Sequence, residues 1–260
     1  MTNTSNVLIG NYVQRGAQSA LGTVAVGVNI DKLERGGNSP HGVLRIASPV
    51  NVQTRLLYNP AMNYANFVVP LLLMLLVHQI IVMSSSMSWA KEFETGLHLE
   101  SGVRVSSFEF FCAKSIPYGV MSLTWLIIEA TAAHAWLGIP FQGNVGVLGL
   151  FGLIVALNVV VVGALVGLIV RSKVGVVQLL FFTSMPLLLI SGGSWPLESM
   201  PLPIRCIAFL LPSTHIMTSY RRLALEGSGF AELWPAFASL LFLAAGYFTL
   251  VRRLLSRQEC

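Results

Sequence analysis

Three long stretches of the chain carry no charged side chain, and they restrict the possible folds more than any other feature. No Asp, Glu, Lys or Arg occurs in residues 56–90, 130–170 or 233–251. About 20 apolar residues suffice to cross a bilayer as a helix. Only 10% of the 260 residues are charged and 54% are hydrophobic, whereas a soluble domain has about 25% charged residues. The sequence therefore predicts an all-α integral membrane protein.

Five segments are apolar enough to span the membrane. Each should be helical, because a segment in lipid must satisfy its own backbone hydrogen bonds. The expected spans are residues 66–88, 115–137, 145–170, 174–193 and 234–251. They predict a transmembrane domain over residues 63–260, with long loops at 89–114 and 194–233.

The basic residues of the loops predict the orientation of the chain, because cytoplasmic loops carry an excess of Lys and Arg. On one side the loops contain Lys91, Arg104, Lys114, Arg171, Lys173, Arg252, Arg253 and Arg257. On the other side they contain only Arg205, Arg221 and Arg222. The first side, with the C-terminus, is expected to be cytoplasmic. No basic cluster is interleaved with aromatic residues, so the net charge of +5 does not indicate a nucleic-acid partner.

The first 62 residues predict part of a small extracytoplasmic α/β domain. Residues 6–20 can form a helix, residues 36–40 a loop, and residues 50–56 a strand. One helix and one strand cannot close a core alone, and no signal-like apolar core starts the chain. We expect a first transmembrane helix and further strands to precede Met1; the alternative is a short tail translocated without a signal.

A Ser-Gly-Gly sequence at residues 191–193 looks like the signature of an ABC ATPase, but its surroundings exclude that function. It ends an uncharged run over residues 174–197, and no Gly-x-x-x-x-Gly-Lys-Ser/Thr loop occurs in the chain. The predicted orientation of the chain also places residues 191–193 on the extracytoplasmic side. The glycines and the prolines at 196, 201 and 203 instead predict an extracytoplasmic re-entrant segment. Its candidate gate residues are Ser191, Gly192, Gly193 and Trp195.

Polar residues inside the expected spans are a second set of candidates. Glu129 could line a substrate path or bind a proton, because a carboxyl in the membrane is costly unless paired, protonated or hydrated. The alternative is that it lies near the outer interface and reaches headgroups or a neighbouring helix. His78, Gln79 and Asn158 could line the path, although interhelical hydrogen bonds are the commoner role. The Gly163-x-x-x-Gly167 pattern predicts close helix packing.

Three motifs, in order, carry a resemblance to a known family. The first runs from Arg55 to Pro70, the second from Lys91-Glu-Phe-Glu-Thr-Gly96 to Lys114. The third is Leu189-Ile-Ser-Gly-Gly-Ser-Trp-Pro-Leu-Glu-Ser-Met-Pro201, followed by Leu211-Pro-Ser-Thr and Tyr220-Arg-Arg. Together they resemble the ectodomain junction, cytoplasmic loop and re-entrant segment of type-2 ABC exporter permeases. Two departures are the missing first helix with half of the ectodomain, and Gly96-Leu97-His98 in place of the usual Gly-Thr-hydrophobic pattern.

The resemblance implies an exporter subunit of a bacterial inner membrane. It further implies a dimer or pseudo-dimer of permeases, with identical or different subunits, and a separate or fused ATPase, which would hold ATP and magnesium. Residues 91–114 alternate apolar and charged side chains, as an amphipathic helix at a membrane surface does. This loop is a coupling helix or only an interfacial anchor. The candidate coupling residues are Glu92, Phe93, Glu94, Gly96, His98, Glu100 and Arg104.

Two other functions fit the sequence less well than an ATP-driven exporter. A secondary transporter would use Glu129, but the chain shows no inverted repeat. An enzyme would need a nucleophile and base or a metal set, and neither His-Glu-x-x-His nor Gly-x-Ser-x-Gly occurs. Cys112, Cys206 and Cys260 have no metal-type spacing. We therefore expect no catalytic site, cofactor or metal in this chain, and its apolar spans do not specify a substrate.

Overall fold

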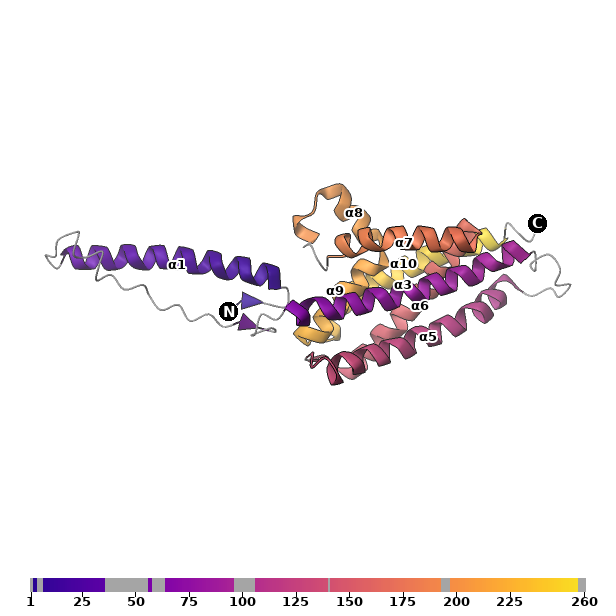
Figure 1. The fold of residues 1–260 in the computed structure, drawn as a ribbon, viewed down its shortest axis with the longest axis horizontal. Coiled ribbons are helices and arrows are strands. Elements are labelled where there is room, and N and C mark those ends of the chain that lie inside the picture. Colours follow the sequence, from indigo (N-terminus) through magenta and orange to yellow (C-terminus); the bar gives the residue numbers. More distant parts are fainter. Residues whose placement is uncertain are drawn as a thin grey trace. The chain divides into compact units, whose positions relative to one another are not determined.

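The structure is a computed structural model, and it describes residues 2–3, 7–35, 56–57, 64–95, 106–139, 141–192 and 197–256. The chain divides into two compact units, Met1–Phe67 and Val68–Cys260. Figure 1 shows the helices of both units along the chain.

The first unit contains one long helix and a short pair of strands. Helix α1 spans Val7–Arg35, and strands β1 (Thr2–Asn3) and β2 (Leu56–Leu57) pair in parallel, with Thr2 opposite Leu56. The helix is longer than the predicted 6–20, because no proline interrupts the chain before Pro40. The predicted loop at 36–40 and most of the predicted strand lie outside the described residues. An α/β ectodomain stays a prediction.

The second unit is a bundle of long apolar helices. In the described part of the chain five helices are long and apolar enough to cross a membrane. They are α3 (Tyr64–Thr95), α5 (Ser107–Ala135), α6 (Val145–Val170), α7 (Lys173–Ile190) and α10 (Phe230–Ser256). Figure 1 shows them running side by side. The predicted helical class is confirmed for this unit, and its five candidate spans match the predicted number.

The loop predicted at 89–114 is shorter in the structure, because helices extend into it from both sides. Helix α3 continues to Thr95 and α5 already begins at Ser107. A capping box starts α5: the backbone N–H of Ser106 donates to Glu109 Oε2 at 3.2 Å. Residues 96–105 lie outside the described part, so a separate surface helix there stays a prediction.

The segment predicted as a loop at 194–233 contains helices. A 3-10 turn (η1, Leu197–Ser199) precedes α8 (Leu202–Leu210) and α9 (Pro212–Glu226). Proline fits the first turn of a helix because the N–H it lacks there would have no intrahelical partner. The prolines at 203 and 212 therefore start α8 and α9 rather than break them.

Helix α9 is an internal part of the bundle. Ten of its 15 residues are buried. The left-handed Gly227 (φ 67°) ends α9, so that the chain turns into α10. The hydroxyl of Tyr247 in α10 donates to the carbonyl of Leu210, just before α9. The turn at Gly227 and the hydrogen bond from Tyr247 to Leu210 hold α9 and α10 as an antiparallel hairpin.

Helix α6 is the central helix, and it approaches α3 through its glycines. A Cβ atom at Gly167 would lie 2.5 Å from both the Ser86 carbonyl oxygen and the Trp89 Cβ. A Cβ at Gly163 would overlap the Ser85 side chain. The predicted close packing of Gly163-x-x-x-Gly167 is confirmed, and its partners are the serines and tryptophan of α3.

We expect Gly167→Val to destabilise the bundle, because the new side chain meets the α3 backbone. Overpacking of this kind costs about 1–3 kcal/mol. Thermal unfolding in detergent, followed by tryptophan fluorescence, measures the loss. Gly149→Val is the matched control, because no atom lies within 4 Å of a Cβ at Gly149. Equal melting temperatures for the two variants would contradict the packing described.

Candidate functional site

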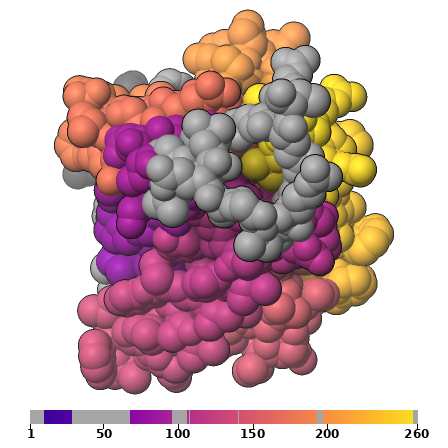
Figure 2. Space-filling model, turned by 90° about the vertical axis from the view of Figure 1, so that its right-hand side faces the viewer, coloured from indigo at the N-terminus to yellow at the C-terminus, as the bar shows by residue number. Residues whose placement is uncertain are grey.

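The ends of four helices, α3, α5, α6 and α7, meet on one side of the bundle and form a polar and aromatic cluster, here called the helix-end junction. It comprises Trp89, Glu92, Phe93 and Glu94 of α3, Phe110 and Lys114 of α5, and Arg171 and Lys173 at the α6–α7 turn. Figure 2 views the molecule from the end where this cluster lies, with α3 (purple) between α7 (orange) and α5 (pink).

Lys114 connects α5 to α3. Its ammonium forms an ion pair with Glu92 Oε1 and lies 5.2 Å from the ring centroid of Trp89 and 5.6 Å from that of Phe110. The lysine side chain is only 10% exposed. A cation over aromatic faces and beside a carboxylate is stabilised from both directions. The two helix ends are therefore held at a defined separation.

Glu94 connects the same end of α3 to the start of α7. Its Oε1 accepts a hydrogen bond from the backbone N–H of Lys173 at 2.8 Å, and its Oε2 lies 3.0 Å from the Lys173 ammonium. The first N–H groups of a helix have no partner within it. Glu94 supplies one of these partners, and Ser172 Oγ supplies another by accepting from Gly175 N–H at 3.4 Å.

Arg171 gives the α6–α7 turn its shape. It ends α6 in the left-handed conformation (φ 56°), which is uncommon for a residue other than glycine. Its Nε donates to the Leu168 carbonyl at 3.2 Å, and its guanidinium carbon lies 5.0 Å from the centroid of Phe93. The turn is thus held against α3 by a side chain at its apex.

These contacts make the end of α3 a common attachment for the neighbouring helices. A force applied near Glu92 and Glu94 would reach α5 through Lys114 and α7 through Lys173. Of the predicted coupling residues, Glu92, Phe93 and Glu94 belong to the junction. The others lie outside the described residues: Gly96, His98, Glu100 and Arg104.

Sequence reasoning did not predict the partners in the junction, although a signal was present. Opposite charges flank consecutive spans, with Glu92 and Glu94 after one span and Lys114 and Lys173 before two later ones. In a bundle of antiparallel helices such ends lie on the same side. Trp89 had no comparable signal, because a tryptophan at the end of a span is also typical of a membrane interface.

The polar residues within the spans differ from one another in their contacts. Gln79 Nε2 of α3 donates to the Leu180 carbonyl of α7 at 2.7 Å, so the expected interhelical bond is present. Asn158 is fully buried, but its Nδ2 donates to Ile154 of its own helix at 2.9 Å, and its Oδ1 has no partner. His78 is buried, and its Nδ1 has no partner.

Glu129 is buried inside the protein, which does not favour the headgroup contact that was one of its alternatives, and its role stays a prediction. Its side chain is 4% exposed, and neither carboxyl oxygen has a hydrogen-bond partner. His134 does not serve as its partner, because His134 Nδ1 lies 3.2 Å from the Ile139 carbonyl. Helix packing places this carboxyl away from lipid, and a buried polar group without a partner is destabilising.

The opposite end of the bundle holds the predicted gate residues that the structure describes. Ser191 ends α7, and its hydroxyl donates to the Leu188 carbonyl at 2.9 Å. Gly192 has a left-handed backbone (φ 76°), and its carbonyl accepts a hydrogen bond from Arg221 Nη1 of α9 at 3.4 Å. Burial lowers the pKa of the Arg221 guanidinium. Gly193 and Trp195 lie outside the described residues.

The fold and this arrangement of helix ends define a multi-pass membrane protein without recognisable catalytic sequence motifs. Comparison of sequences identifies its family: residues 2–253 match the model of the ABC-2 family transporter proteins, and the chain belongs to this family. The resemblance seen in the three motifs is confirmed. The chain is therefore a membrane subunit of an ABC transporter.

Several relatives are similar in sequence. The inner membrane transport permease YhhJ of Escherichia coli is 29% identical over 77% of this chain and 54% of its own length. The probable multidrug ABC transporter permease YbhS of the same organism is 24% identical over 69% of this chain and 48% of its own. ABC transporter G family member 20 of Dictyostelium discoideum is 27% identical over 75% of this chain and 27% of its own length. The chain spans about half the length of the bacterial relatives. No solved structure matches the chain.

We expect Glu92→Gln to destabilise the protein more than Glu94→Gln. Glu92→Gln leaves the largely buried Lys114 ammonium without its carboxylate. The expected loss in the free energy of unfolding is about 1–3 kcal/mol, which is somewhat less than the cost of breaking a fully buried ion pair. Glu94→Gln affects a solvated pair that is screened by water and salt. Melting temperatures of the two variants, with Lys114→Met to complete a double-mutant cycle, measure the difference. Equal losses would contradict the assigned roles.

Glu129→Leu should leave the melting temperature unchanged or raise it, because a buried carboxyl without partners contributes a penalty of about 1–3 kcal/mol. Leucine has a similar size and removes that penalty. Unfolding in detergent is again the measurement, with Leu126→Ala, a cavity-creating change in the same helix, as a control for sensitivity. A clear drop for Glu129→Leu would show that the carboxyl has a stabilising partner.

Proposed function

We propose that the chain is the permease subunit of an ATP-driven exporter and that an ATPase partner acts on the helix-end junction. One observation carries the proposal: the end of α3 is joined to α5 by Glu92–Lys114 and to α7 by Glu94–Lys173. A partner pressing on this end would move three helices together. The family supports an ATPase partner, because ABC transporters couple their membrane subunits to ATP hydrolysis.

The proposed orientation places the junction in the cytoplasm of a bacterial inner membrane. Its cations and those of the neighbouring α10 end, Arg252 and Arg253, are the excess expected on the cytoplasmic side. The C-terminus would be cytoplasmic too. ATP and magnesium would be bound by the partner. Residues 96–105 connect α3 to α5 at this end, which is where a coupling contact would form.

A second copy of the permease is proposed to complete the translocation path. Helix α7 is the least buried span, and its large side chains are exposed, with Phe182 74% exposed and Met185 68% exposed. Movement of α7 through Glu94 would also move the exposed face of α7. A path between the α7 faces of the two copies would therefore open and close as the helix-end junction moves. The substrate is then determined by surfaces of both copies.

The segment from Ser191 to Glu226 is proposed as the outer gate. Helix α9 lies against α10 and carries buried polar side chains, as a re-entrant element at the outer end would. The contact of Arg221 with Gly192 joins α9 to the end of α7. Movement of α7 would therefore displace α9 as well.

The coupling proposal is tested with a swapped ion pair in the complex of permease and ATPase. Glu94→Lys should abolish substrate-stimulated ATPase activity while the subunits still co-purify, because two cations then repel at the start of α7. Glu94→Lys combined with Lys173→Glu should restore part of the stimulation, because the swap re-forms the ion pair but a lysine at position 94 cannot accept the backbone N–H of residue 173. The matched control is the exposed Arg253→Gln. Full stimulation in the single Glu94→Lys variant would exclude this pair from coupling.

The energy source is tested in proteoliposomes that contain the same complex. An ATPase partner with an inactivated nucleotide site should abolish transport, and collapse of the proton gradient should not. Transport that follows the proton gradient without ATP, and that Glu129→Gln abolishes, would identify a secondary transporter instead. The observation that favours a proton-driven secondary transporter is the buried carboxyl of Glu129, which has no hydrogen-bond partner.

A further inference from the structure

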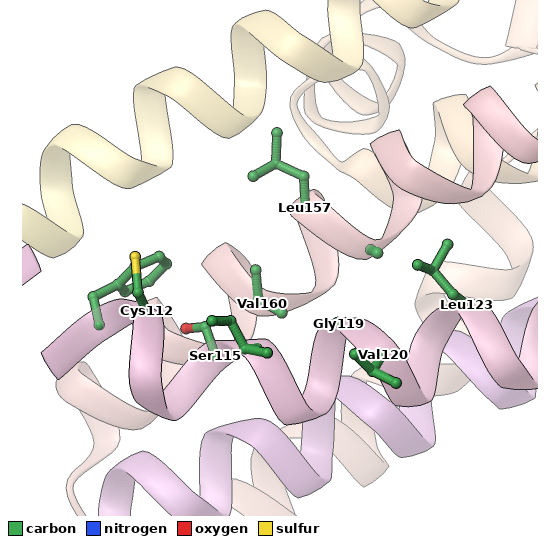
Figure 3. A pocket seen from close by; sticks show the side chains of 10 residues that line it. Cys112, Ser115, Gly119, Val120, Leu123, Leu157 and Val160 are labelled. Carbon is green, nitrogen blue, oxygen red and sulfur yellow. The ribbon is translucent and has the colours of Figure 1, made fainter. Parts of the chain in front are cut away.

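A groove runs along the surface of the bundle between α5 and α6. It has a volume of about 310 Å³. Figure 3 shows Cys112, Ser115, Gly119 and Leu123 along one helix, with Leu157 and Val160 of α6 opposite. Ile116 and Val120 on its rim are more than half exposed. The groove is apolar apart from one hydroxyl and one thiol.

The hydroxyl of Ser115 is the unexplained polar group of this groove. Ser115 is 4% exposed, and its Oγ has no hydrogen-bond partner. Serines in helices often donate to the carbonyl four residues earlier, as Ser86 does. Ser115 makes no such bond, so a donor is left buried in an otherwise apolar groove. Because Ser115 lines the groove, an acceptor that enters the groove from outside the chain would satisfy this donor.

The depth of Ser115 indicates which acceptor would reach it. The apolar part of α5, Phe108–Ala135, has 28 residues and is about 42 Å long at 1.5 Å per residue. The hydrocarbon core of a bilayer is about 30 Å thick, so about 6 Å of helix remains at each end. Ser115 lies seven residues after Phe108, roughly 10 Å along the helix. It is then within about 5 Å of the hydrocarbon boundary, where phospholipid ester carbonyls lie.

The length of the groove fits one leaflet. From Phe111 to Leu123 it extends about 18 Å along α5, and one leaflet contributes about half of a 30 Å core. A transmembrane helix of a second protein would contact the whole length of α5, whereas an acyl chain ends near the midplane. Gly119 lies in this stretch, and a Cβ there would meet only Val160 Cγ1, at 3.7 Å.

A positive charge lies at the end of the groove that would face the headgroup. Phe111, which begins the groove, packs against Phe248 of α10, with ring centroids 5.1 Å apart. Arg252 follows Phe248 by one helical turn, is on the same face of α10, and is exposed. Cytoplasmic leaflets contain anionic lipids that attract such residues.

We propose that this groove is a binding site for an anionic phospholipid of the cytoplasmic leaflet. The acyl chain lies along Gly119 and Leu157, Ser115 Oγ donates to an ester carbonyl, and Arg252 faces the phosphate. The bound lipid fills the space between α5 and α6 next to the helix-end junction. Lipid composition would thus affect the stability of the transporter at that end.

The native thiol of Cys112 provides the test, because it lines the groove. The full-length protein in detergent is labelled with a maleimide, and the rate at each cysteine is measured by peptide mass spectrometry. Phosphatidylglycerol should slow labelling of Cys112 several-fold, and phosphatidylcholine should slow it less. Cys206, exposed on α8, is the internal control and should be unaffected.

Three variants separate the parts of the proposed site. Gly119→Leu fills the groove and should abolish the lipid-dependent protection, whereas Gly149→Leu should retain it. Arg252→Gln should remove the preference for phosphatidylglycerol, and Arg253→Gln, on a different face of α10, should keep it. Ser115→Ala should weaken the protection by both lipids.

The proposal is overturned if neither lipid changes Cys112 labelling or if protection persists in Gly119→Leu. A Cys112–Cys112 disulfide between two copies would also overturn it, because it would show that a second copy of the chain occupies the groove. Native mass spectrometry of the wild type should show retained phosphatidylglycerol that Gly119→Leu lacks, and its absence from the wild type would contradict the site.

Discussion

The absence of side chains at Gly163 and Gly167 determines how the rest of the bundle is arranged. Lipid is as apolar as the helices, so close packing, not expulsion of water, holds transmembrane helices together. Because the α6 glycines lie against Ser85, Ser86 and Trp89, α3 passes close to the central helix. Its end then falls where Glu92 and Glu94 meet Lys114 and Lys173. The helix-end junction is in this sense a result of the glycine contact deeper in the membrane.

The sequence was sufficient to predict the spans but not the ends of the helices. Long uncharged runs locate the hydrocarbon core for four of the five spans, and hydropathy locates the fifth, α5, which contains Glu129. A helix does not end where its charges begin, because its backbone continues to bond outside the lipid. Helix α3 therefore reaches Thr95, beyond the predicted end at residue 88. The hairpin of α9 and α10 was missed for a related reason: prolines that break a helix in its interior begin one in its first turn.

The candidate site was predictable only in part. Glu92, Phe93 and Glu94 follow from the amphipathic pattern and the family motif, but their partners depend on which helix ends meet. Glu129 shows the limit most clearly. A carboxyl near the end of a span can face lipid or protein, and only the packing of the neighbouring helices decides between them. Helical periodicity gives no clear signal for that choice, because polar residues such as Ser122, Thr124 and Thr131 are spread around the same span.

The hairpin of α9 and α10 also constrains the biogenesis of the protein. Helix α9 has polar residues such as Ser213, Thr214 and Ser219 buried against its neighbours, so it is poorly suited to enter lipid alone. Its surroundings include α10, which is synthesised after it. Helix α9 can reach its final packing only after the last span has been inserted. Assembly at this end cannot follow the order of translation, and a ribosome that stalls before α10 leaves this part of the bundle unfinished.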